Sequence, residues 1–278
     1  MVGRGDARVD RVGPLVCALG VLAVANVSNN RIARRWAPVT SVAATVALLA
    51  IARRDGLTWA DLGFQHADRG ARLGGALAAG VVIGYAAGVA SPRTRPLFLD
   101  ERALALSRTR LLEEIMVQVP LGTVLLEEVA FRGVLPALFG RPFPSRTAAA
   151  AAAVSFGLWH VLPAMDMARA NPALGHLTAG DSTQAGGAGA EDGAGAEAPP
   201  AGSTGRLVAG TVLSTALAGT AFQELRRRGG LLAPSLTHLA TNSFGYLAAR
   251  VARKLDARSA SRVRSAGPAA GSAHRWSR

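Results

Sequence analysis

The chain has 278 residues, half of them hydrophobic, and a formal net charge of +13. Its apolar residues come in long runs almost without charge, close to the length that spans a bilayer, which argues against a soluble domain. The basic residues, of which only Lys254 is lysine, flank these runs instead of forming one stripe, so we expect membrane anchoring and no nucleic-acid binding. A single cysteine, Cys17, excludes an intrachain disulfide and a cysteine-rich metal site.

The N-terminal region is expected to cross the membrane three times. Its first apolar run contains Ala23-Val24-Ala25, which fits a signal-peptide cleavage site. A second run follows after a short turn, however, and this favours an uncleaved hairpin. Before the third run, residues 55–70 interleave apolar and acidic residues and predict a short amphipathic element at the lipid headgroups. The three predicted spans are residues 12–27, 37–52 and 73–90.

The next apolar stretch, residues 111–139, is too long for one straight span and contains Pro120. Proline removes a backbone donor from a helix, so we divide the stretch there into an approach helix and a fourth span over residues 121–139. Glu113 and Glu114 lie on the approach helix without an arginine four residues further on. We therefore expect them on a solvated helix face.

The remaining sequence predicts three more spans, a long loop and a tail. Residues 164–205 are rich in Gly, Ala, Pro and Ser without a periodic apolar face, which predicts a flexible loop with a reach of roughly 35 Å. Residues 250–278 are basic and rich in Ser and Ala, which predicts a disordered or membrane-surface tail. The last three predicted spans are residues 147–162, 207–222 and 231–249.

These patterns predict an all-α fold, a polytopic membrane bundle of about seven spans. Residues 1–110 form its N-terminal spans with the interfacial segment. Residues 111–249 form a core interrupted by the insertion 164–205, and residues 250–278 form the tail.

Charged side chains inside the fourth predicted span are the first candidates for chemistry. Each costs roughly 2.5 to 3.5 kcal/mol near the bilayer centre, so such residues persist where they pair or line a polar cavity. Glu128 and Arg132 are four residues apart and share a helix face. Glu127 points about 100° away from them and is therefore the freer carboxylate.

Two further predicted spans carry polar residues at a matching depth. His160 lies on the fifth span, and His238 and Asn242 share a face of the seventh. At about 1.5 Å per residue, Glu127, His160 and His238 lie about 20, 21 and 12 Å from helix ends on one side of the membrane. All three fall near the middle of a core roughly 30 Å thick. A satisfied interface histidine or a structural ion pair explains each cluster alone, but the shared depth favours one functional site.

Three motifs follow one another in this part of the chain. They are Glu-Glu-x-x-x-Arg at residues 127–132, Phe-x-x-x-His at 156–160 and His-x-x-x-Asn at 238–242, the last preceded by Arg-Gly-Gly-Leu-Leu-Ala-Pro at 228–234. In combination and order they resemble the CAAX protease and bacteriocin-processing family of intramembrane metalloproteases, to which the prenyl-protein endopeptidases belong. The similarity covers about residues 122–245 and says little about the substrate.

The resemblance implies a multi-pass endopeptidase of the cell membrane that cleaves a membrane-associated protein or peptide. Carried over motif by motif, it implies catalytic roles for Glu127, Glu128, Arg132, His160, His238 and Asn242. Glu127 is the expected general base on a water molecule. No serine or cysteine stands in the constellation as a nucleophile, since Cys17 is on another span and Ser155 is poorly spaced from His160.

Two roles are open for the histidines. The family's usual name implies a zinc ion, Zn2+, held by His160 and His238, with one coordination position open for water. Without a metal, His160 helps to polarise the water, while His238 and Asn242 donate hydrogen bonds to the tetrahedral oxyanion.

Two other classes of membrane protein stay open. One is a non-catalytic bacteriocin-immunity or partner-binding protein on the same scaffold. A biological phenotype that survives the change Glu127→Gln, at a normal protein level, would favour this class over an enzyme. The other is a transporter, whose inverted repeat of broken helices the sequence does not show. The sequence leaves the membrane orientation and the oligomeric state open.

Overall fold

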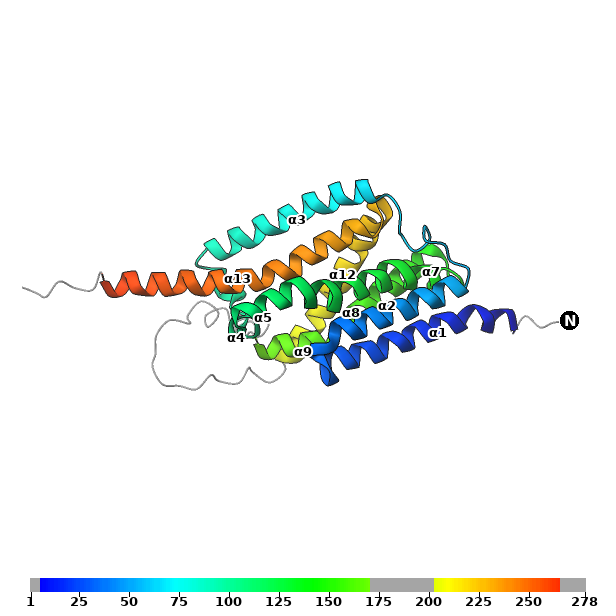
Figure 1. The fold of residues 1–278 in the computed structure, drawn as a ribbon, viewed down its shortest axis with the longest axis horizontal. Helices are drawn as coiled ribbons and strands as arrows, with labels where there is room; N and C mark the ends of the chain where they lie inside the picture. Colours follow the sequence, from blue (N-terminus) through cyan, green and yellow to red (C-terminus); the bar gives the residue numbers. More distant parts are fainter. Residues whose placement is uncertain (1–5, 171–202, 266–278) are drawn as a thin grey trace, which may run out of the picture.

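The computed structural model describes residues 6–170 and 203–265. Within these ranges all regular structure is helical, and the long helices run along one axis of an elongated bundle (Figure 1). This confirms the all-α membrane bundle that the sequence predicts. The α-helices are α1 (Asp6–Val27), α2 (Ala37–Arg54), α3 (Ala67–Ala90), α4 (Glu101–Ala105), α5 (Arg108–Glu113), α6 (Leu125–Glu128), α7 (Leu135–Phe139), α8 (Ser145–Trp159), α9 (Val161–Ala170), α12 (Ser203–Gly229) and α13 (Leu232–Ser265). Short 3₁₀- and π-helical segments connect them, namely η1 (Ser28–Ile32), η2 (Arg34–Trp36), η3 (Arg95–Phe98), η4 (Glu114–Val124) and η5 (Val129–Val134).

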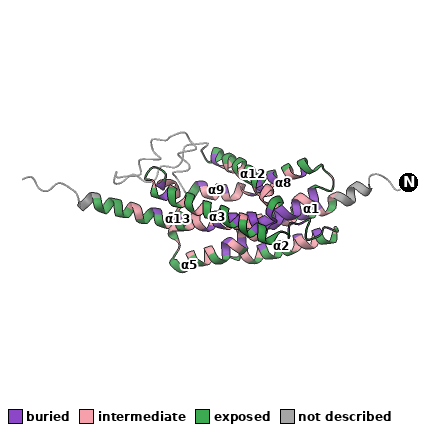
Figure 2. Ribbon diagram, turned by 90° about the horizontal axis from the view of Figure 1, so that it is seen from above, coloured by how far each residue is buried: buried purple, intermediate pink, exposed green. Residues whose placement is uncertain are grey.

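The outer faces of the bundle are apolar. Buried residues gather in its interior and exposed residues cover the outside (Figure 2). Among the exposed side chains are large hydrophobic ones, such as Val24 at 68% and Ile83 at 69% exposure. Such surfaces suit lipid rather than water. Four helical segments of the described residues are long and apolar enough to cross a membrane, namely Val12–Ile32, Arg34–Arg54, Ala67–Ala90 and Ser145–Arg169.

The count of seven spans stays a prediction. The predicted sixth and seventh spans lie within α12 and α13, and the predicted fourth lies within the run that ends at α7. These segments are helical as expected, but they are not among the four that meet the length and hydropathy of a membrane span.

The predicted division at Pro120 is wrong. Residues 108–139 form one continuous helical run from α5 to α7, and Pro120 lies inside its π-helical segment η4. Proline interrupts the regular hydrogen-bond pattern of an α-helix, but the wider π turns relax this pattern. The helix therefore continues past Pro120 instead of ending there. The backbone N–H of Leu125 closes the segment by donating to the Pro120 carbonyl. Glu127 and Glu128 thus lie in the single α-helical turn between two π segments, a setting common at functional sites.

The predicted fifth span is interrupted at His160, where α8 ends with φ −86° and ψ 2°. The chain then enters α9, whose first turn contains Pro163 at a position where a missing N–H is tolerated. The predicted loop 164–205 is therefore helical at both ends, over residues 164–170 and 203–205. Its remaining residues lie outside those that the structure describes.

The first part of the predicted tail is not disordered, because α13 continues without a break from the seventh predicted span to Ser265. Tertiary contacts support this extension. Asp256 forms an ion pair with the buried Arg95 at 3.1 Å, and Arg250 donates to the carbonyl of Leu106. Residues beyond 265 lie outside the described part of the chain.

The predicted interfacial element at residues 55–70 has the expected two faces but little regular helix. Leu57 and Leu62 are buried, whereas Trp59 and Phe64 are half exposed and stack edge to face with centroids 5.4 Å apart. Turns rather than a helix produce this alternation, and α3 begins only near the end of the segment.

Close helix packing holds α3 and α13 side by side (Figure 1). At Gly74 of α3, a Cβ atom would lie 2.7 Å from the main-chain oxygen of Ala233, so only glycine permits this approach. On another side, α2 packs against η4, where the Ser41 hydroxyl donates to the carbonyl of Gly122 at 2.6 Å. These contacts fix the helix that carries the two adjacent glutamates.

Candidate active site

Glu127 and Glu128 occupy the single turn α6 and are both buried, with 5% and 1% of their surfaces exposed. Adjacent residues on a helix point about 100° apart, and their side chains enter different surroundings. Glu127 lines a cavity of about 560 Å³. Glu128 instead faces Arg132, at 3.5 Å, in the packed interior. The carboxylate that the helical period predicts to be freer is the one at the cavity.

The two oxygens of Glu127 have different environments. Oε1 accepts a hydrogen bond of 2.8 Å from the indole Nε1–H of Trp159. Oε2 is buried without a hydrogen-bond partner among the described residues. It lies 3.8 Å from Nε2 of His160 and 3.7 Å from Nε2 of His238, too far for direct hydrogen bonds. The three atoms therefore converge on a common space rather than bonding to one another.

The other nitrogen of each imidazole is held by a protein oxygen. Nδ1 of His160 lies 2.8 Å from the carbonyl oxygen of Phe156, and Nδ1 of His238 lies 2.7 Å from Oε1 of Glu128. A carbonyl and an ionised carboxylate only accept hydrogen bonds, which assigns the hydrogen to Nδ1 in both rings. Each ring is thereby oriented with its Nε2 atom towards Glu127.

The positive charge of Arg132 compensates the negative charge of Glu128 inside the bundle. Its guanidinium lies over the rings of Phe156 and Phe222, 3.8 and 4.9 Å from their centroids. Phe156 belongs to α8 and Phe222 to α12, so the arginine joins three helical segments. A buried charge is tolerated when it is paired, and the aromatic faces add cation–π attraction. This arrangement keeps Glu128 in place as the acceptor for His238.

Asn242, the last of the predicted site residues, lines the same cavity as Glu127 and His160. Its amide has no hydrogen-bond partner among the described residues, so its N–H groups are free to bind a molecule in the cavity. The structure thus brings all six predicted residues into one constellation. Their roles in a reaction stay predictions.

The cavity also contains a residue that the sequence reasoning placed elsewhere. Glu114, expected on a solvated helix face, lines the cavity and accepts a hydrogen bond of 3.0 Å from the hydroxyl of Tyr246. The unbroken run through Pro120 determines this orientation, and the assumed helix break concealed it. A regular helical period would place Glu114 about 140° from Glu127 around the helix axis, so residue spacing alone provides no signal for it.

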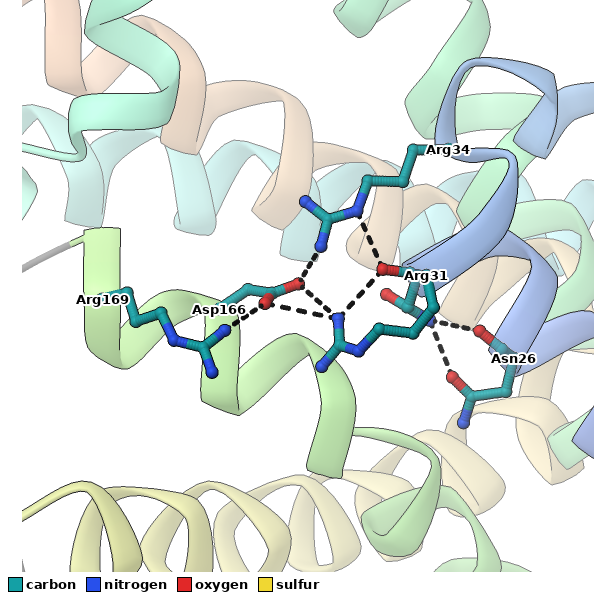
Figure 3. A network of polar contacts seen from close by, with 6 residues as sticks. Asn26, Arg31, Arg34, Asp166 and Arg169 are labelled. Atoms are coloured by element: carbon teal, nitrogen blue, oxygen red, sulfur yellow. Dashed lines mark hydrogen bonds and ion pairs between the residues drawn. The ribbon is translucent and has the colours of Figure 1, made fainter.

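One rim of the cavity is built around Asp166 on α9. This carboxylate forms ion pairs with Arg31, Arg34 and Arg169 at 3.1, 2.9 and 3.2 Å (Figure 3). Arg31 and Arg34 follow α1, and both Arg34 and Asp166 line the cavity. The N-terminal hairpin therefore supplies part of the cavity wall.

The predicted zinc ion would have to share a ligand with the proposed base. A catalytic zinc site uses three protein ligands, and no three His, Cys, Asp or Glu side chains of the described residues are arranged to hold a metal ion. Among the described residues, the acidic donor beside His160 and His238 is Glu127, and as a ligand it would no longer be a free base. The site does not fit a zinc ion together with a separate glutamate base. Zinc binding by the two histidines stays a prediction.

Part of the chain is similar to a known protein family. Residues 114–244 match the family model described as type II CAAX prenyl endopeptidase Rce1-like. The match covers a little less than half of the chain. The matched segment contains all six predicted site residues and leaves out α1, α2 and α3. No curated protein and no solved structure matches the chain. The likeness to this family points to a protease, and the apolar helices indicate a membrane protein.

Proposed function

We propose that this protein is an intramembrane endopeptidase in which Glu127 activates the attacking water molecule. The observation that carries the proposal is the convergence of Glu127 Oε2 with the Nε2 atoms of His160 and His238, within 3.8 Å, at the cavity. Buried polar atoms require partners. A water about 2.8 Å from Oε2 and from the Nε2 atom of His160 would satisfy both.

In this mechanism Glu127 moves one proton. Its Oε2 atom takes the proton as the water oxygen attacks the substrate carbonyl carbon, and later gives it to the leaving amine as the C–N bond breaks. His160, whose Nδ1–H is bound to the Phe156 carbonyl, offers the lone pair of Nε2 to the second hydrogen of the water. The histidine thus orients the nucleophile.

The oxyanion receives hydrogen bonds from Asn242 and His238. The amide of Asn242 is at the cavity, and His238 as an imidazolium donates through Nε2 while Glu128 serves as its counter-ion. In that form the charges of Arg132 and His238 balance those of the two glutamates. A site without net charge is the least costly one inside a bilayer.

The substrate class follows from the family. Its description names a CAAX prenyl endopeptidase, and we carry this over as cleavage of a prenylated, membrane-associated protein or peptide at the cell membrane. The exposed apolar faces of the bundle support a position in the bilayer, which would also hold the prenyl group of such a substrate.

The test is Glu127→Gln in purified protein, assayed with a farnesylated fluorogenic peptide and its unprenylated counterpart. We expect kcat/KM to fall by about 10²- to 10⁴-fold, because the amide cannot accept the proton. Glu113→Gln is the matched control, since Glu113 lies on the same helical run, pairs with Arg110 and is partly exposed.

The control variant should retain wild-type kinetics. Full activity of Glu127→Gln would contradict the mechanism. Failure of the wild-type protein to cleave either peptide, with its biological phenotype intact in Glu127→Gln, would favour the non-catalytic alternative.

A further inference from the structure

Trp159 contacts the proposed base although it occupies a variable position of the Phe-x-x-x-His motif. Its side chain is 7% exposed, and its indole N–H donates to Oε1 of Glu127 at 2.8 Å. The indole also packs edge to face on Phe131, with ring centroids 5.5 Å apart. Phe131 lies one helical turn beyond Glu127, so the same helix supplies both the acceptor and the surface against which the donor rests.

The backbone of Trp159 is held from a different helix. In a continuous helix its carbonyl would accept from the N–H of the fourth residue on, but that residue is Pro163, which has none. The side-chain amide of Asn26 on α1 donates to this carbonyl instead, at 3.1 Å. Asn26 is itself fixed by the amide of Asn30, which donates to Asn26 Oδ1 at 2.7 Å, at the edge of the Asp166 network (Figure 3).

We propose that Trp159 is a positioning residue for the reaction and that Asn26 holds it in place. The terminal torsion of a glutamate is broad, so a carboxylate with one oxygen unrestrained samples several orientations. Because the Trp159 indole holds Oε1, the carboxylate of Glu127 is restricted to the orientation in which Oε2 lies between the Nε2 atoms of the two histidines. This inference rests on the proposed function, because it concerns Glu127 as a base. It also gives the first helix, outside the Rce1-like segment, a part in the reaction.

The kinetic test is Trp159→Phe, which keeps an aromatic ring and removes the N–H. We expect kcat to fall about 10- to 100-fold with KM within about 2-fold, since a shift of about 1 Å in a reacting group has this scale of effect. Trp36→Phe is the matched control, because Trp36 is 65% exposed, and it should be unchanged.

Asn26→Leu removes the hydrogen bond to the Trp159 carbonyl with little change in side-chain size, and it should lower kcat as Trp159→Phe does. The two effects should not add in the double variant, because both act through the same hydrogen bond.

The structural test leaves Trp159 intact. In a spectrum of ¹⁵N-labelled indole groups, the Trp159 signal is the one that disappears in Trp159→Phe. We expect Glu127→Gln to shift this signal and to leave that of Trp59 in place, because a neutral amide is a weaker acceptor than a carboxylate.

Wild-type kcat in Trp159→Phe, or an unmoved Trp159 signal in Glu127→Gln, would overturn the inference. Full activity of Glu127→Gln is a different result, because it would show that Glu127 is not the base and would thereby remove the positioning role. A shifted Trp159 signal in that variant would still report the hydrogen bond between the two side chains.

Discussion

Glu127 and Glu128 are adjacent in sequence and both buried, yet their surroundings differ. The cavity half of the site consists of Glu127, His160 and Asn242, which all line the open cavity. The sealed half consists of Glu128 and Arg132, and His238 connects the two halves: the Glu128 oxygens face His238 Nδ1 at 2.7 Å and Arg132 at 3.5 Å. Burial alone therefore does not identify the reactive carboxylate. The open cavity in front of Glu127 distinguishes it, because Glu128 does not line that cavity.

The largest expected effect on stability lies in the sealed half. Arg132→Ala leaves Glu128 buried without its counter-charge, and we expect the free energy of unfolding to fall by about 3 to 5 kcal/mol. Unfolding of the purified protein in detergent with increasing denaturant measures it. Arg141→Ala is the control, since its ion pair with Asp55 is at the surface and is worth less than about 1 kcal/mol. Equal stability of the two variants would contradict a structural role for the sealed half.

Variants in the cavity half should lower kcat and leave the free energy of unfolding nearly unchanged. Asn242→Ala removes a free amide donor, so we expect kcat to fall by about 10²- to 10³-fold, the cost of losing one oxyanion donor. The free energy of unfolding should stay within about 0.5 kcal/mol of the wild type, since no described hydrogen bond is lost. Thr241→Ala, at the neighbouring cavity residue, should leave kcat unchanged. An Asn242→Ala protein with normal kcat would remove the amide from the mechanism.

The sequence predicted those relations that depend on helical period and motif order. The pairing of Glu128 with Arg132 and the separate direction of Glu127 follow from residue spacing on one helix. The convergence of His160 and His238 on Glu127 follows from comparing depths in different spans. Both could be predicted because a helix has a regular rise and rotation.

Relations that depend on packing between helices were not accessible in this way. Pro120 predicts a helix break, because the local effect of proline is visible in the sequence and the compensating π turns are not. Residues 250–265 looked disordered by composition, but contacts such as Asp256 with Arg95 support a helix there. The hydrogen bond from Trp159 to Glu127 requires two helices to be rotated correctly about their axes, which spacing along one chain does not define.

Metal removal is expected to have the smallest effect. The donor set does not supply three ligands and a separate base, so chelation followed by assay should leave kcat/KM unchanged, with or without added zinc. Elemental analysis of the treated protein measures the metal content. Loss of activity that zinc restores would instead establish His160 and His238 as ligands and assign Glu127 a different role.

The most direct test of the difference between the two halves is a side-by-side measurement of Glu127→Gln and Glu128→Gln. Turnover per folded molecule and the free energy of unfolding are measured for both variants in the same detergent. We predict that Glu127→Gln loses at least about 10²-fold in kcat with its stability intact. Glu128→Gln should lose about 3 to 5 kcal/mol of stability and keep more turnover than Glu127→Gln. A Glu128→Gln protein of native stability that is as inactive as Glu127→Gln would contradict the assignment of chemistry to one glutamate and structure to the other.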